Sequence, residues 1–240
     1  MLTKTPGLVL RMLKYSDKST IVTVYTRDYG RVSYIVYGLS GKKSGVRAAC
    51  FLPLSLIEVT ASYHPGKEFQ QLREVRVLNS LTNIYNHPLK NALTHFTAEL
   101  LYKTLKQPEP EVHLYDFLEQ SVLFLEQTET EIANFHLVFM MKLSGYLGFE
   151  PSREEKNARY FDLLNGIFLT NKPLHSHFLS AEMSTLLNSL LQLSFESGNT
   201  LVLSREKRNE LLNGLIEYYK LHVPEFHGLN SVSVLHEMFN

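Results

Sequence analysis

Residues 7–38, GLVLRMLKYSDKSTIVTVYTRDYGRVSYIVYG, decide the fold of the first part of this chain. Three runs rich in β-branched and aromatic residues, 7–15, 19–26 and 30–38, alternate with two short polar connections. This composition is typical of strands, and connections of this length are typical of antiparallel hairpins. The stretch therefore predicts three consecutive antiparallel strands.

Two further strands are expected downstream, at 51–63 and 68–80, on either side of a His-Pro-Gly turn. Five short strands favour a small closed barrel such as the OB-fold, with an SH3-like barrel as the alternative. The loop GLSGKKSG at 38–45 does not match a nucleotide-binding P-loop, because Lys43 stands where Ser or Thr is required and a strand follows. This loop is either a solvated turn or a contact for phosphate groups.

After residue 80 the apolar residues recur every three or four positions, which predicts helices. Ser180 is an expected N-cap, and Ser204 begins an incomplete capping box. Residues 149–180 are less regular, and their two apolar runs around Asn165-Gly166 predict a hairpin with Asn-Gly as its turn. The expected helical segments are 89–100, 114–125, 132–143, 180–193 and 204–223.

The chain has no net charge at pH 7, but its two parts differ. Residues 1–80 carry 12 Lys or Arg against 5 Asp or Glu, whereas residues 81–240 carry 12 against 19. We therefore expect an α+β protein with a basic barrel domain at 1–80 and an acidic, mainly helical domain at 81–240. A basic domain attracts phosphate backbones.

The sequence lacks the common catalytic and metal-binding motifs. A single cysteine excludes an internal disulfide and a multi-cysteine metal site. A metal-dependent hydrolase would have to use His175 and His177, and no third ligand stands nearby at a recognisable spacing. With neither a membrane-length apolar run nor a signal peptide, we expect a non-enzymatic, cytoplasmic protein without a cofactor.

Cations and tyrosines gather around the barrel connections. In an OB-fold, the ligand lies across strands two and three, between the loops that join strands one and two and strands four and five. Strand alternation places Tyr34 in the core and Tyr37 on the outer face, where it could stack on a base. The candidate nucleic-acid-binding residues are Arg27, Arg31, Tyr37, Lys42, Lys43, Arg47, Lys14, Lys18 and Lys67. The alternative is a protein-interaction adaptor whose basic barrel binds acidic peptides or partner proteins.

Three segments of the chain resemble the bacterial DNA repair protein RecO family. They are the Gly-x-Val-Leu strand with its polar hairpin and basic loop at 7–45, LGFEP at 147–151, and YYKLHVPEFHGLNSVSVLHEMF at 218–239. The resemblance implies an N-terminal OB-fold and a C-terminal helical domain. It also implies a recombination mediator that binds single-stranded DNA, anneals complementary strands and helps to load recombinase onto DNA coated with single-strand-binding protein.

The same resemblance implies two protein partners, RecR and the C-terminal tail of the single-strand-binding protein, and a nucleoid-associated location. Many members carry a four-cysteine zinc module after the LGF segment, but this chain has REEKNARYFDLLNG at 153–166, with no cysteine. An irregular segment at about 149–180 is thus expected in place of the zinc module. By the same resemblance, the basic-loop role falls on Lys42, Lys43 and Arg47, with Arg31 on the preceding strand.

Overall fold

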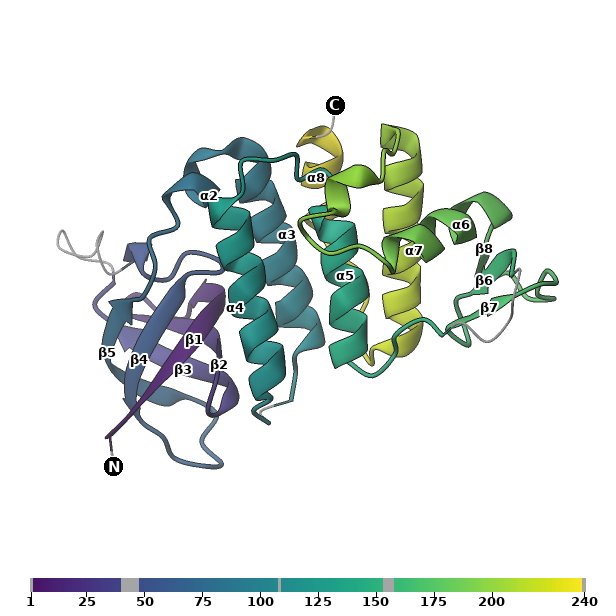
Figure 1. The fold of residues 1–240 in the computed structure, drawn as a ribbon. Helices are drawn as coiled ribbons and strands as arrows, with labels where there is room; N and C mark the ends of the chain where they lie inside the picture. Colours follow the sequence, from purple (N-terminus) through teal and green to yellow (C-terminus); the bar gives the residue numbers. More distant parts are fainter. Residues whose placement is uncertain (1, 40–47, 108, 153–157, 239–240) are drawn as a thin grey trace. The chain divides into compact units, whose positions relative to one another are not determined.

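The structure, a computed structural model, describes residues 2–39, 48–107, 109–152 and 158–238. The chain divides into two compact units, Met1–Gln127 and Thr128–Asn240 (Figure 1). Among the described residues, no helix is both long enough and apolar enough to cross a membrane.

A closed five-stranded barrel forms the first part of the first unit (Figure 1). Its strands follow one another round the barrel in the order β1-β2-β3-β5-β4, and the pairing of β3 with β5 is parallel. This topology confirms the predicted barrel and suits an OB-fold. The strands are β1 (Leu2–Lys14), β2 (Ser19–Thr26), β3 (Gly30–Tyr37), β4 (Leu56–Ser62) and β5 (Gln70–Val77).

Strand alternation fills the barrel as expected. Tyr34 is 2% exposed and belongs to the barrel core, whereas Tyr37, three residues later, is 57% exposed. Valine side chains of β2 and β3 supply much of the remaining core. The β-branched residues that predicted strands therefore also provide the apolar interior of the barrel.

The fourth strand begins later than predicted, at Leu56 instead of residue 51. The preceding residues form a turn that contains Pro53, which has no N–H for a ladder, and Leu54, which has a positive φ of 60°. This turn is fixed to β1, because Leu54 N donates to Val9 O at 2.8 Å and Val9 N donates to Ser55 O at 3.0 Å.

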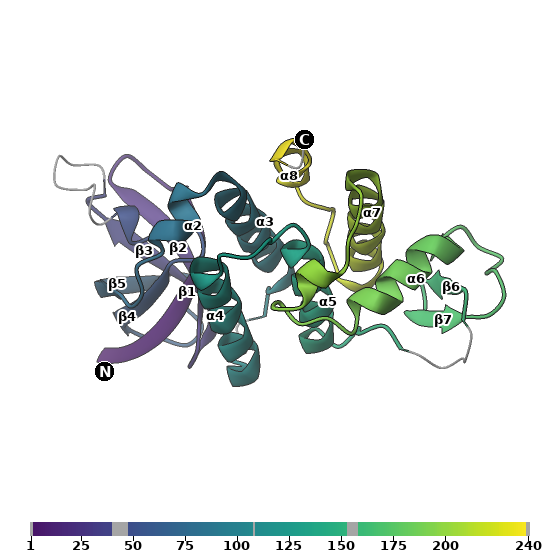
Figure 2. The same cartoon turned by 45° about the horizontal axis from the view of Figure 1, so that its top comes forward.

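After the barrel strands, the described part of the first unit continues with the helices α2 (Thr82–Asn86), α3 (Pro88–Thr104) and α4 (Val112–Gln127). The carboxylate of Glu126 in α4 accepts hydrogen bonds from the N–H groups of Asn83 and Ile84 in the first turn of α2, at 3.0 and 2.9 Å. Helices α3 and α4 lie beside the barrel in two views (Figures 1 and 2). The first unit thus contains a helical layer as well as the barrel.

The second unit is mainly helical and includes a small antiparallel sheet of order β7-β6-β8. Ser180 and Ser204 cap their helices as expected, accepting from the N–H groups of Met183 and Lys207. The predicted hairpin is confirmed, but its turn spans four residues, 163–166, instead of the two residues Asn-Gly. The elements are α5 (Phe135–Tyr146), β6 (Tyr160–Asp162), β7 (Ile167–Leu169), β8 (Phe178–Leu179), α6 (Ala181–Leu190), the 3₁₀ helix η1 (Gly198–Thr200), α7 (Arg205–His222) and α8 (Val232–Met238).

Candidate nucleic-acid interface

The β1–β2 turn brings two predicted cations close to the end of β3. Lys14 and Lys18 flank this turn, and Lys14 Nζ lies 3.1 Å from a carboxylate oxygen of Asp17. The N–H of Gly38, just after β3, donates to the carbonyl of Lys18 at 3.2 Å. Tyr37 therefore stands next to this turn with most of its ring in solvent. The backbone of Lys18 and the exposed side chain of Tyr37 are thus neighbours at this end of the barrel.

The connection between β4 and β5 carries Lys67 and is held in shape by a buried side chain. Gln70, 3% exposed, accepts from His64 N at 2.9 Å and donates to His64 O at 2.8 Å and to Lys67 O at 3.2 Å. These bonds satisfy backbone groups that a loop would otherwise leave to water. Next to Gln70, the ring of Phe69 lies 6.0 Å from that of Tyr15, centroid to centroid.

Arg27 and Arg31 have a different environment, because they contact the helical layer of the first unit. Arg27 Nη2 lies 3.2 Å from a carboxylate oxygen of Asp116 in α4. Arg31 Nη1 donates to the carbonyls of Tyr102 and Leu105 at the C-terminal end of α3, at 2.7 and 2.8 Å. The last carbonyls of a helix lack intrahelical partners, and a cation is favourable there.

Two arginines of the barrel lie over the ring of Tyr102. The guanidinium carbon of Arg11 is 4.7 Å from the ring centroid and that of Arg31 is 4.5 Å from it. Burial lowers the pKa of the Arg31 guanidinium. Arg31 therefore joins β3 to α3, through two carbonyls and the Tyr102 ring.

The predicted residues thus form two groups instead of one continuous surface. The register of β2 with β3 places Tyr37 opposite Ser19 at one end and Gly30 opposite Thr26 at the other. Seven residue steps separate these ends, which is about 23 Å at about 3.3 Å per residue. The first group is Lys14, Lys18, Tyr37 and Lys67; the second is Arg27 and Arg31. Lys42, Lys43 and Arg47 lie outside the described residues.

Two aromatic residues near the first group were not among the predicted site residues. Tyr15 is 61% exposed and Phe69 is partly buried beside it. The expected strands 7–15 and 68–80 included both residues, whereas in the structure β1 ends at Lys14 and β5 begins at Gln70. A polar run next to each ring, Ser16-Asp17-Lys18 and Gly66-Lys67-Glu68, is the signal that could have placed both rings at strand ends instead of in the core.

A polar pocket of about 270 Å³ lies elsewhere on the barrel, on the outer face of β1, β4 and β5. It is lined by two carboxylates, Glu58 and Glu74, and by two cations, Lys4 and Arg76. Arg76 Nε is 3.5 Å from Glu58 Oε1. A phosphate backbone would meet both signs of charge here, so this pocket is a weaker candidate than the β1–β2 turn.

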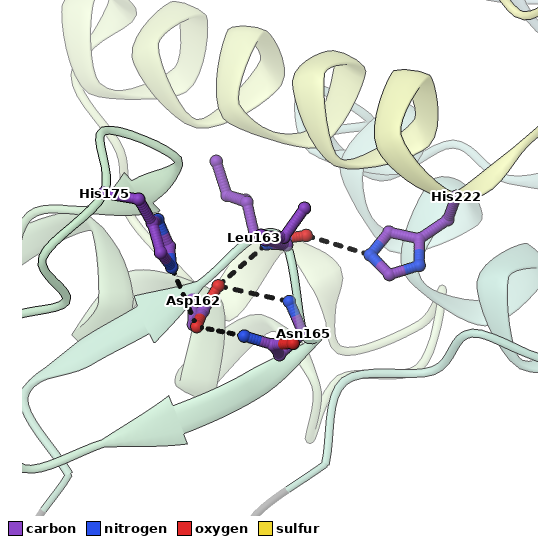
Figure 3. Close-up of polar contacts among 6 residues, drawn as sticks. Asp162, Leu163, Asn165, His175 and His222 are labelled. Atoms are coloured by element: carbon purple, nitrogen blue, oxygen red, sulfur yellow. Dashed lines mark hydrogen bonds and ion pairs between the residues drawn. The ribbon is translucent and has the colours of Figure 1, made fainter.

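The segment expected in place of a zinc module is organised around Asp162 (Figure 3). Its carboxylate accepts from Leu164 N at 2.8 Å and from Asn165 N at 3.1 Å, and it also bonds to the Asn165 side chain and to His175 Nε2. Burial would raise the pKa of the Asp162 carboxyl, but these hydrogen bonds outweigh burial and lower it. A buried carboxylate thus holds this hairpin turn together.

The two histidines of the hydrolase hypothesis have separate partners. His175 contacts Asp162 at 3.2 Å, and His177 Nδ1 lies 3.5 Å from Glu217 Oε1. Within the described ranges, no three His, Cys, Asp or Glu side chains are grouped as metal ligands. His222 donates its Nε2–H to the Leu163 carbonyl, 2.9 Å away, and so joins α7 to the same turn (Figure 3).

Comparison with known proteins assigns the chain to a family. Residues 1–81 match the family model described as recombination protein O N terminal, and residues 86–230 match recombination protein O C terminal. Relatives named DNA repair protein RecO include those of Phocaeicola vulgatus (37% identical), Bacteroides fragilis (38%) and Christiangramia forsetii (33%). In all three cases the match covers 100% of this chain and 100% of the relative. With matches over both parts of the chain and over the full length of these relatives, the chain belongs to the RecO family.

Proposed function

We propose that this chain is a non-enzymatic, DNA-binding recombination mediator in DNA repair. It binds single-stranded DNA, anneals complementary strands and helps to load recombinase onto DNA coated with single-strand-binding protein. Family membership supports the role in repair. The observation that carries the binding proposal is the meeting of Lys14, Lys18 and exposed Tyr37 at one end of an OB-fold barrel within a strongly basic segment.

Annealing follows from charge neutralisation. Two DNA strands repel through their phosphates, and cations that replace bound counterions reduce this repulsion. A barrel with an excess of cations over residues 1–80 can hold both backbones while their bases remain free to pair. No bond to the substrate forms or breaks, so no catalytic residue is required. The acidic segment 81–240 repels DNA and leaves the barrel as the binding part.

We propose that the protein partners in this role are RecR and the C-terminal tail of single-strand-binding protein. An acidic peptide with an apolar end binds best to an apolar groove that also offers a cation. If the barrel were instead an adaptor for acidic peptides, such a peptide would compete with DNA for the same lysines. Competition experiments with a synthetic acidic tail peptide distinguish these two functions.

The test is binding of a fluorescent single-stranded oligonucleotide to the full-length protein across a salt series. The logarithm of affinity should fall against the logarithm of salt concentration with a slope of about 0.7 per phosphate contacted. Lys18→Gln should reduce this slope, whereas Lys172→Gln, an exposed lysine of the second unit, should leave it unchanged. A protein that binds no oligonucleotide at low salt would exclude the proposed function.

A further inference from the structure

One half of the outer face of β2 and β3 is covered by helices α3 and α4. Side chains that alternate with the barrel core should face solvent, yet outward-facing Thr23 is 4% exposed and Tyr25 is 2% exposed. Their burial results from the helical layer, since Arg31 is bonded to α3 and Arg27 to α4. Nucleic acid therefore has no access to this half of the strands while α3 and α4 are in place.

The other half of the same face is apolar and open. Leu13 in β1 pairs with Ile21 in β2, and Ile21 pairs with Ile35 in β3, so the three side chains form one outward row. Leu13 is 48% exposed, and the two isoleucines are only partly buried. Tyr37 is the next outward residue of β3 after Ile35. Leu13, Ile21, Ile35 and Tyr37 therefore make one apolar, partly open strip on this half of the barrel.

Tyr15 and Phe69 border this open half. Their rings are 6.0 Å apart and tilted by 45°, and they come from the two connections that flank the ligand in OB-folds. Gln70, buried and bonded to the His64 and Lys67 carbonyls, fixes the backbone next to Phe69. The Phe69 ring is therefore held in place, and it supports the more exposed ring of Tyr15.

We propose that Tyr15, Phe69 and Tyr37 form a base-stacking platform, and that single-stranded nucleic acid crosses the open half of the barrel at this platform. The proposal rests on the proposed function and specifies where the strand lies. Exposed rings suit bases because every base has a π-face, and the neighbouring Lys18 and Lys67 supply positive charge for the backbone. The path is shorter than the full length of β2 and β3, and it excludes Arg27 and Arg31.

The experiment compares full-length variants on an oligothymidylate and on an abasic strand of the same length. Loss of one stacked ring weakens binding by about tenfold. Tyr15→Ala and Tyr37→Ala should therefore weaken binding to oligothymidylate by about this factor, with little change on the abasic strand. The salt dependence should stay the same, because no phosphate contact is removed. Tyr146→Ala is the control, since Tyr146 is 44% exposed in the second unit.

A second variant tests the platform without removing a ring. The chain contains no tryptophan, so Tyr15→Trp introduces a single indole at the proposed site. It should retain affinity, and its fluorescence should be quenched by oligothymidylate more than by the abasic strand. The double variant Tyr15→Trp/Phe69→Ala should show weaker quenching than Tyr15→Trp alone, because the ring that supports residue 15 is missing.

The outcomes separate this proposal from the proposed function. If the wild-type protein binds oligothymidylate but Tyr15→Ala and Tyr37→Ala bind equally well, the platform is wrong and the DNA-binding function stands. Equal weakening on both strands would also overturn the platform, because the rings would then act on the backbone. A wild-type protein that binds neither strand would reject the proposed function itself.

Discussion

Replacing Arg31 should destabilise the first unit rather than remove a DNA contact. The guanidinium donates to two carbonyls at the end of α3, and hydrogen bonds to a charged group contribute about 1.5–3 kcal/mol each. Stacking on Tyr102 adds about 0.5–1 kcal/mol. Desolvation of the guanidinium offsets part of this gain, so we expect Arg31→Ala to reduce the local free energy of unfolding by about 2–4 kcal/mol.

The assay is hydrogen–deuterium exchange of the full-length protein, followed by mass spectrometry of peptides from β3 and the end of α3. A loss of about 2 kcal/mol or more accelerates exchange through local opening about 30-fold or more. Arg31→Lys should lie between the wild type and Arg31→Ala, because an ammonium can still donate to the carbonyls but lacks the planar group that stacks on the Tyr102 ring. Arg73→Ala, at an exposed position of β5, is the control and should change little.

A different result would show that Arg31 contacts DNA. If Arg31→Ala leaves exchange in β3 and α3 unchanged but lowers the salt dependence of DNA binding, Arg31 contacts phosphate in solution. The division of the predicted residues into two groups would then be wrong.

Three further outcomes are expected. Lys42→Glu with Lys43→Glu should strongly reduce affinity for single-stranded DNA and lower the salt slope by about 1.4 if both lysines contact phosphates; an unchanged slope in the folded variant would remove them from the site. Burial lowers the pKa of His136 to about 3, so in the folded state this histidine stays neutral while in the unfolded state it takes up a proton below about pH 6.5. The free energy of unfolding should therefore fall by about 1.4 kcal/mol per pH unit as the pH is lowered from about 6.5 to about 3. Urea titrations of His136→Gln should show a shallower pH dependence than those of the wild type. Gly166 has φ +70° and an added Cβ would lie 2.7 Å from Tyr218 Oη, so Gly166→Ala should lower the unfolding temperature of the second unit, whereas equal melting curves would contradict this strain.

The secondary structure was largely predictable because its signals are local. The bounds of β2 match the expected 19–26, and β3 differs from 30–38 by one residue. The caps Ser180 and Ser204 were also predictable, since a hydroxyl before a helix bonds to an N–H three residues later. The late start of β4 was missed, because the contacts between Leu54 and Val9 come from residues far apart in the chain.

The candidate site was predictable only in part. Alternation alone placed Tyr34 inside and Tyr37 outside. The same alternation placed Arg31 on the outer face, but it could not reveal that the end of α3 covers that face. Likewise, Tyr15 and Phe69 belong to separate connections, and only the closure of the barrel brings them together.

Composition and short-range periodicity were enough to predict the barrel, the helices and the contrast in charge between the two parts, while the segments at 7–45, 147–151 and 218–239 carried the resemblance to the RecO family. The tertiary structure decided which cations contact helices and which rings remain open to a ligand. The physical reason is that a strand's period of two defines two faces, while the elements that pack on each face are set by long-range contacts.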